Sequence, residues 1–267
     1  MEFILILIIA SLFSAFGTII GFGGGIFMIP VLVIVFKVPI NIAAGSVIIA
    51  LIPGSLISSF YNFKRKKIDL SAGVILEIPT IIGTILGAYL TSVLFSNTLE
   101  ITFALFVSLV GISMIKNKKD DKNMKIFKKI NDLNPALIRQ SGQLKYRINY
   151  FLSSFFGLVA GVMSGLFGIG GGFLKTPIMI NVFNIPPSVA AATALFMIFF
   201  TSLTGSISHL YLGHLNFKFS TPIVLGFILG AFIGNKLNIK FSEKTIRMLI
   251  ALGLICAGVS VLIHVFT

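Results

Sequence analysis

Long apolar runs separated by short polar segments dominate the chain. A helix needs about 20 apolar residues to cross the hydrocarbon core of a bilayer, and most of these runs are near that length. The pattern therefore predicts an all-α integral membrane protein. The apolar regions cover residues 3–36, 42–60, 70–95, 99–115, 149–183, 189–212, 217–235 and 246–266.

Glycine clusters interrupt the first and the fifth of these regions, which are also the longest. The first cluster runs from Gly21 and the second from Gly168, and a proline (Pro30, Pro177) follows the last glycine of each by five residues. Three consecutive glycines favour no regular structure. Each region is too long for one span and too short for two spans with a turn. We therefore expect a full helix followed by a half-helix or re-entrant segment in both.

The two glycine clusters belong to an internal repeat. Adding 147 to a residue number in the first half gives its counterpart in the second half over much of the chain, so that Gly21 and Pro30 match Gly168 and Pro177. The repeat predicts eight transmembrane helices as two four-helix repeats, with a glycine-broken first helix in each. The predicted parts are residues 1–115 for the first repeat, 116–147 for a basic linker and 148–267 for the second repeat.

Composition and charge agree with a protein surrounded by membrane lipids. Hydrophobic residues make up 56% of the chain and charged residues 11%, whereas soluble domains carry about 25% charged residues. The net charge of +13 comes from basic residues between the apolar runs. This placement fits the positive-inside bias of membrane proteins and argues against nucleic acid as a partner. We expect a multi-pass protein of the cytoplasmic membrane.

The basic residues also predict a topology. The loop at 64–67 and the linker at 116–147 are both expected in the cytoplasm. Four spans per half would then place both termini in the cytoplasm and make the two repeats parallel. Within the linker, residues 126–130 either form part of an amphipathic surface helix or belong to a flexible, solvated segment.

Enzyme chemistry has little support in the sequence. The single cysteine, Cys256, forms neither an internal disulfide nor a multi-thiolate metal site. The sequence contains no metal-ligand cluster, no nucleophile motif and no P-loop. We therefore predict neither enzymatic activity nor a cofactor. The acidic Glu2 and the apolar sequence that continues past the glycines argue against a cleaved signal peptide.

The glycine clusters are the candidate binding site. Irregular backbone at membrane depth persists only where it is buried in protein or lines a polar cavity. A half-helix that starts after the glycines would point free N–H groups and its positive dipole end at an anion. The alternative is that the glycines only allow close helix packing. The candidate substrate-binding residues are Gly23, Gly24, Gly25, Ile26, Pro30, Ser46, Gly170, Gly171, Gly172, Phe173, Lys175, Pro177 and Thr193.

A few polar residues in apolar runs have two interpretations each. Lys175 either pairs with the anion or extends to the membrane interface. His209 is either a proton-coupling residue or a packed histidine. Glu77 is a second candidate for proton coupling, although a carboxylate in the first turn of the third span is the favoured interpretation. The hydroxyls of Ser46, Thr193, Thr201 and Ser202 either contact substrate or bond to helix carbonyls.

The paired motifs and the four-plus-four duplication resemble the TauE/SafE sulfite exporter family, also called the 4-toluene sulfonate uptake permease family. The resemblance covers nearly the whole chain, and the linker matches least. It implies a transporter of sulfur-containing anions such as sulfite or sulfonates. The motif glycines, Pro30 and Pro177 are the positions that match. The copies differ at Met28, which corresponds to Lys175, so the site is expected to be asymmetric.

The function predicted from the sequence is therefore transmembrane transport of a small anion, a sulfur oxyanion or organosulfonate, by a secondary carrier mechanism. A passive anion channel with the same pore residues is one alternative. A membrane assembly or signalling protein, whose glycines serve packing, is another. The sequence leaves homo-oligomerisation open.

Overall fold

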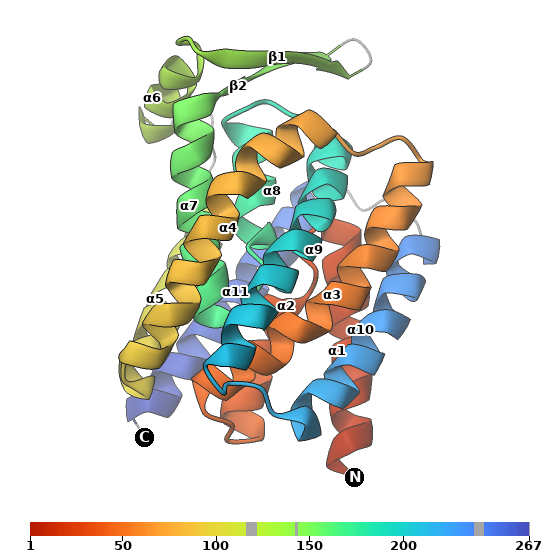
Figure 1. The fold of residues 1–267 in the computed structure, drawn as a ribbon, viewed down its shortest axis with the longest axis vertical. Helices are drawn as coiled ribbons and strands as arrows, with labels where there is room; N and C mark the ends of the chain where they lie inside the picture. Colours follow the sequence, from red (N-terminus) through yellow and green to blue (C-terminus); the bar gives the residue numbers. More distant parts are fainter. Residues whose placement is uncertain (116–121, 142–143, 238–242, 267) are drawn as a thin grey trace.

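The computed structural model describes residues 1–115, 122–141, 144–237 and 243–266 and is mostly helical (Figure 1). In the part of the chain described, six helices are long and apolar enough to cross a membrane. These are α1 (Glu2–Ile20), α3 (Ile40–Lys64), α4 (Leu70–Val93), α7 (Tyr150–Phe167), α9 (Pro187–Tyr211) and α10 (Phe217–Leu237). Two further apolar helices are α5 (Ser96–Ile115) and α11 (Glu243–Phe266). Each predicted apolar region thus contains a helix.

Both glycine clusters end one helix and start a short one, as the sequence predicted. In the first cluster α1 stops at Gly21, and α2 (Gly25–Pro30) begins after Gly24, whose φ of 93° is left-handed. A π-helical turn, η1 (Val31–Val35), continues α2. In the second cluster α7 stops before Gly168, and α8 (Gly172–Asn181) begins after Gly171 at φ 70°. Glycine is required at these positions because L side chains rarely adopt such angles.

The linker is folded, and it contains the one departure from an all-helical chain among the described residues. Helix α6 (Lys122–Asn131) includes the predicted amphipathic segment, and its Phe127 packs on Phe156 of α7. Strands β1 (Ala136–Ser141) and β2 (Leu144–Asn149) form an antiparallel hairpin. Tyr146 and Ile148 alternate along β2 and are both buried. Burial of every second side chain favours a strand over a helix, because successive side chains of a strand point to opposite faces.

Glycines bring the long helices into close contact. Helix α7 packs along α4, and α10 packs along α1, more extensively than any other helix pairs. A Cβ on Gly161 of α7 would lie 2.1 Å from the carbonyl oxygen of Thr80, so the two backbones touch there. Likewise, a Cβ on Gly230 of α10 would lie 2.3 Å from the carbonyl oxygen of Ser11 in α1. Small residues are what allow membrane helices to approach this closely.

Corresponding helices of the two halves run in opposite directions. The N-terminus lies at the end of the molecule opposite the β-hairpin, so α1 runs toward the hairpin end, whereas α7 starts there and runs away from it (Figure 1). The C-terminus also lies opposite the hairpin (Figure 1). The linker and the termini therefore cannot share one side of a membrane that these helices cross. This arrangement contradicts the prediction of parallel repeats with the linker and both termini in the cytoplasm.

The physical reason is the glycine break in each half. Helix α1 and the α2–η1 segment form a hairpin, which returns the chain to the end where it began before α3 starts (Figure 1). Three further helices, α3, α4 and α5, then cross the molecule. An odd number of net crossings per half places the start and the end of each half at opposite ends.

Candidate functional site

The two glycine clusters meet in the middle of the molecule. The Thr176 hydroxyl of α8 donates a hydrogen bond to the carbonyl oxygen of Gly21, at 3.1 Å. Leu51 of α3 and Ile198 of α9 pack against both clusters: a Cβ on Gly23 or on Gly170 would lie within 3.4 Å of each of these side chains. Apolar side chains from α3 and α9 therefore pack where the two clusters meet.

The predicted glycine residues serve first to allow close packing of the backbone around the clusters. A Cβ on Gly24 would lie 2.4 Å from the carbonyl oxygen of Phe13, and the short helices after the clusters bury Ile26 and Phe173. Pro30 and Pro177 lie inside α2 and α8. The half-helices themselves are thus present where the sequence placed them, and whether their N-termini bind substrate stays a prediction.

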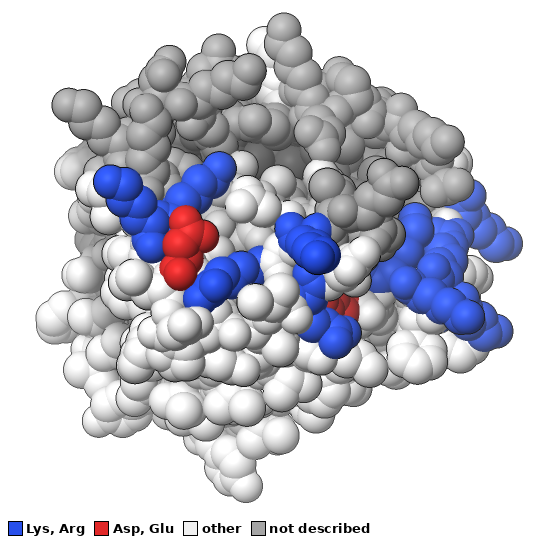
Figure 2. All heavy atoms as spheres, turned by 90° about the horizontal axis from the view of Figure 1, so that it is seen from above, with Lys and Arg blue, Asp and Glu red and all other residues white. Residues whose placement is uncertain are grey.

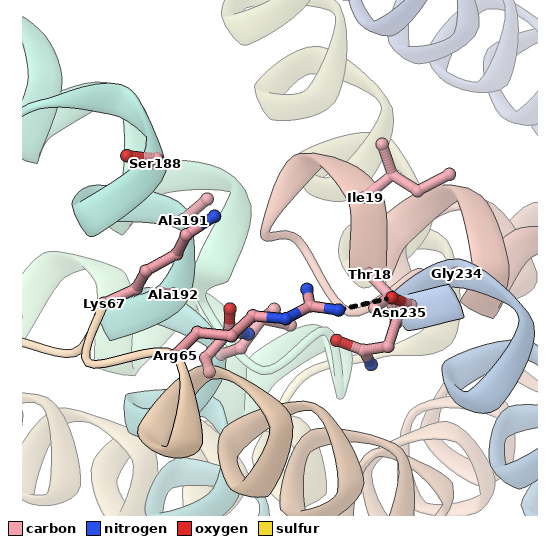
Figure 3. A pocket seen from close by; sticks show the side chains of 11 residues that line it. Thr18, Ile19, Arg65, Lys67, Ser188, Ala191, Ala192, Gly234 and Asn235 are labelled. Carbon is pink, nitrogen blue, oxygen red and sulfur yellow. Dashed lines mark hydrogen bonds between the residues drawn. The ribbon is translucent and has the colours of Figure 1, made fainter. Parts of the chain in front are cut away.

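A polar pocket of about 210 Å³ lies beside the first glycine cluster. Figure 3 shows its lining from close by. It is lined by the ends of α1, α3 and α10, the start of α9, and the loop after α3. Its lining residues are Thr18, Ile19, Asn62, Arg65, Lys67, Ser188, Ala191, Ala192, Leu195, Gly234 and Asn235. Gly21, the first residue after α1, packs on Ala191, which links the pocket to the glycine cluster.

The pocket lining is polar and positively charged. Two cations, Arg65 and Lys67, and the polar side chains of Asn62 and Asn235 line it, and the lining contains no carboxylate. Arg65 is held across the pocket by donating to the carbonyl oxygen of Asn235 at 3.0 Å (Figure 3). A guanidinium still has donors to offer after one such bond, because it carries five.

The pocket lies toward the more basic end of the molecule. Figure 2 shows basic side chains over the face seen from the hairpin side. Lys64 ends α3 and is followed by Arg65, Lys66 and Lys67, Lys128 and Lys129 belong to α6, and Arg139, Lys145 and Arg147 belong to the hairpin. At the opposite end, the described basic residues are Lys37 and Lys218. Such a surface attracts anions from solution before they reach a site.

Lys175 forms a buried ion pair that joins three helices. Its Nζ lies 2.7 Å from the Glu77 Oε2 of α4 and 2.7 Å from the Thr201 Oγ1 of α9. The Thr201 hydroxyl in turn donates to the other carboxylate oxygen. The Lys175 side chain is 1% exposed, so it does not extend to an interface. Glu77 is also buried and lies beyond the first turn of α4, which corrects the favoured interpretation of that residue.

His209 forms a second buried polar contact, toward the end of the molecule opposite the hairpin. Its Nε2 lies 2.8 Å from the carbonyl oxygen of Gly165, so this nitrogen is the donor, and its Nδ1 lies 3.1 Å from the Nδ1 of His214. His214 is in the loop after α9, where burial lowers its pKa. When both rings are neutral, His214 donates the proton of this contact to His209.

Ser46 and Thr193, which the repeat pairs, are both fully buried, but they have different surroundings. The Thr193 hydroxyl accepts from the backbone N–H of Asp69 at 3.0 Å, whereas the Ser46 hydroxyl has no partner in the described part of the chain. Asp69 caps α4 and also accepts from Tyr146 and Arg139 of the hairpin. The hairpin is thereby tied to the loop that carries Arg65 and Lys67.

The fold is that of a multi-pass membrane protein, and comparison with known proteins gives its class and family. The model of the sulfite exporter TauE/SafE family matches residues 5–261. The chain belongs to this family and is therefore a membrane transporter and not an enzyme.

Several curated proteins are similar to it. The chain is 32% identical to the probable membrane transporter protein YunE of Bacillus subtilis, covering 97% of this chain and 96% of that protein. It is 26% identical to the probable membrane transporter protein MJ0441 of Methanocaldococcus jannaschii, with 92% and 90% covered. It is 34% identical to sulfite exporter TauE/SafE family protein 1 of Arabidopsis thaliana, over 43% of this chain and 26% of that protein. No solved structure matches it significantly.

None of the substrate-binding residues predicted from the sequence lines the pocket. In the sequence, Arg65 and Lys67 indicate only the topology, because a basic run after a span is common at cytoplasmic loops. Asn62 and Asn235 were not singled out. The signal for them was weak: an amide near the end of an apolar run is also a normal interfacial residue.

Proposed function

We propose that this protein is a secondary carrier of a small anion, and that the anion is a sulfur oxyanion or an organosulfonate. The observation that carries the proposal is the pocket with Arg65 and Lys67, which ends at the first glycine cluster. The family description supports the sulfur-containing class. Sulfite and small sulfonates are oxyanions whose oxygens suit the amide and guanidinium donors of this pocket.

The arrangement of the helices supports a carrier with two inverted repeats. The offset of 147 pairs α3 with α9, and these two helices pack on each other. It also pairs α1 with α7, and α1 packs on α10 while α7 packs on α4. Helix α10 is the counterpart of α4 in the repeat. In each half, the first helix therefore packs on the corresponding helix of the other half: α1 on α10, and α7 on α4. Inverted repeats of this kind underlie alternating access in many secondary transporters.

The inverted repeat gives the pocket a counterpart near the opposite end of the molecule. Thr18 and Asn62, which line the pocket, correspond to Gly165 and His209. Those two residues are in direct contact through the 2.8 Å hydrogen bond, and His209 is fully buried. An open site on one side with a closed counterpart on the other is what a carrier in one of its two states should have, and it favours a carrier over a passive channel.

The distribution of basic residues supports an orientation with the hairpin end in the cytoplasm and the termini outside. The pocket then opens to the cytoplasm in this state. A protein whose glycines served only assembly or signalling would have no need of a charged pocket beside the first cluster.

Counterflow separates the carrier from the channel. The purified protein is first screened by thermal shift against sulfite, thiosulfate, sulfonates and carboxylates. The anion that stabilises it most is then loaded into proteoliposomes, and entry of the labelled anion is measured. A carrier gives uptake that unlabelled internal anion stimulates. Labelled entry without stimulation would support the channel, and no anion binding or entry at all would support the assembly protein.

Neutralising the pocket cations should weaken binding. We expect Lys67→Gln and Arg65→Gln each to raise the KM for anion uptake about 10- to 100-fold, because each removes a charge-assisted hydrogen bond worth roughly 1.5–3 kcal/mol and 1.4 kcal/mol is a factor of ten. The maximal rate should change less. Lys64→Gln is the matched control, since Lys64 precedes Arg65 at the end of α3 but stacks on Phe60, with its Nζ 4.3 Å from the ring centroid. Equal effects at all three positions would point to surface attraction and not to this pocket.

A further inference from the structure

Neither Lys175 nor Glu77 lines the pocket, so the carboxylate of this pair has no part in anion binding there. Both side chains are almost completely buried, at 1% and 7% exposure. A lysine ammonium has three N–H donors, and two of them are engaged by Glu77 and Thr201. Ionisable residues inside membrane segments are costly to keep and usually belong to substrate or proton pathways.

Two buried hydroxyls without a partner lie on the helices that pack around this pair. Ser202 follows Thr201 in α9, and Ser164 comes from α7. Both hydroxyl oxygens are buried and have no hydrogen-bond partner in the described part of the chain. A Cβ on Gly171 would lie 3.3 Å from the Lys175 Cε and 3.6 Å from the Ser164 Cβ, so lysine, serine and glycine enclose one small region. Buried hydroxyls left unpaired beside an ammonium suit an additional oxygen-bearing ligand.

The pair also lies next to the contact between the glycine clusters. Thr176, the neighbour of Lys175 in α8, donates to the carbonyl oxygen of Gly21, which packs on Ala191 at the pocket. Along α9, the pocket-lining Leu195 is followed by Ile198 and then by Ser202, spaced so that they share one face of the helix. A substrate leaving the pocket past Ile198 therefore approaches the Lys175 region.

We propose that Glu77 binds a proton together with the transported anion, so that the protein is a proton–anion symporter. A proton from water forms an O–H bond with a Glu77 carboxylate oxygen, and the carboxyl group becomes neutral. The Lys175 ammonium thereby loses its counter-charge, and the anion takes the place of the carboxylate as its partner. This inference rests on the proposed anion-carrier function and names its coupling ion.

The coupling follows from the cost of an unpaired charge in a buried site. Protonation of Glu77 without the anion leaves the Lys175 ammonium uncompensated, and arrival of the anion without the proton places two negative groups beside one ammonium. Either state is unfavourable. Each ligand therefore increases the affinity for the other by the same factor. The net charge of the region is the same before and after both have bound when the anion carries a single charge.

Few other ionisable groups lie on the helices packed around Glu77. In α7, α8 and α9 they are Tyr150, Lys175, His209 and Tyr211. Tyr150 and Tyr211 are exposed at helix ends. His209 lies eight residues beyond Thr201 in α9, bonded to Gly165 and close to His214. The hydroxyls of Ser202 and Ser206 precede His209 on the same face of α9 and mark a polar route from the far end.

Proton uptake on anion binding tests the proposal with the unmodified protein. Binding of thiosulfate or methanesulfonate, whose own charges do not change between about pH 5 and 8, is measured by titration calorimetry in two buffers of different ionisation heat. We expect uptake of about one proton for each anion bound. We also expect the affinity for the anion to fall up to about tenfold for each pH unit, once the pH is above the range where Glu77 of the free protein is protonated. Binding with no proton uptake would overturn the symport proposal and leave the anion carrier intact. Absence of binding and of counterflow for every anion in the panel would overturn both.

Glu77→Gln assigns the proton to its site. This variant keeps a hydrogen-bonding group of the same size but cannot titrate. We expect its proton uptake to fall to near zero and its affinity to lose the pH dependence, so that at pH 8 it binds more tightly than the unmodified protein. Glu2→Gln is the control, because Glu2 is an exposed acid paired with Lys218 at the far end, and it should keep the normal proton uptake. Proton uptake that persists in Glu77→Gln would show that Glu77 is not the site.

Discussion

Replacing Lys175 by methionine should lower the free energy of unfolding by about 3–5 kcal/mol, because it leaves the Glu77 carboxylate buried without a partner. Methionine fills a similar volume, so the loss reports the charge and not a cavity. The Thr201 hydroxyl alone cannot compensate a full negative charge. Thermal unfolding in detergent, followed by the helical circular dichroism signal, measures the effect as a lowered midpoint.

Two companion variants make this result specific. Glu77→Gln combined with Lys175→Met removes both charges, and it should recover much of the lost stability. Lys218→Met removes the partner of Glu2 in an exposed pair with an N–O distance of 3.2 Å, and it should change the midpoint very little. If Lys175→Met and Lys218→Met behaved alike, the Lys175 pair would not be buried as described.

Replacing Gly161 by alanine should destabilise the protein by about 3 kcal/mol, the upper end of the usual cost of overpacking. The new Cβ would lie 2.1 Å from the carbonyl oxygen of Thr80 and 2.9 Å from the backbone nitrogen of Thr84. Backbone atoms cannot move aside as a flexible side chain does. Helices α4 and α7 would have to separate along their whole contact, and the Glu77–Lys175 pair between α4 and α8 would be disturbed with them.

Gly54→Ala is the control for this prediction. Gly54 also lies inside a long helix, α3, but the nearest atom to its added Cβ is a Phe227 oxygen at 3.4 Å, an ordinary contact. Alanine has the higher helix propensity by about 1 kcal/mol, so this change should be neutral or stabilising. The same unfolding measurement applies to both variants. An equal response at the two positions would mean that the α4–α7 contact is looser than described.

Local patterns in the sequence were sufficient to predict the membrane spans and the glycine breaks within them. A span needs only a continuous apolar run, and a glycine cluster followed by proline signals where a helix must stop. The structure of the linker was harder to predict from the sequence. Its β-hairpin is held by contacts to other segments, such as Tyr146 with Asp69, and a short alternating run beside lysines carries little signal of its own.

The topology prediction was wrong because it assumed an even number of membrane crossings in each half. The positive-inside bias correctly grouped the loop at 64–67 and the linker at one end. The number of net crossings per half, however, depended on whether the segment after the first glycine cluster returned to its starting side. The sequence predicted a half-helix there without fixing its direction. One hairpin per half changes the parity, and with it the relation between the repeats.

The sequence by itself determined the class of protein, the positions of the helices, the glycine breaks and the family, because each of these depends on residues close together in the chain. The tertiary structure decided what the polar residues do. Glu77 and Lys175 are 98 residues apart in the chain, and Thr201 is 124 residues from Glu77. The pocket gathers Thr18, Arg65 and Asn235 from distant helices. Such contacts depend on how the helices pack, and no local pattern of apolar and polar residues specifies them.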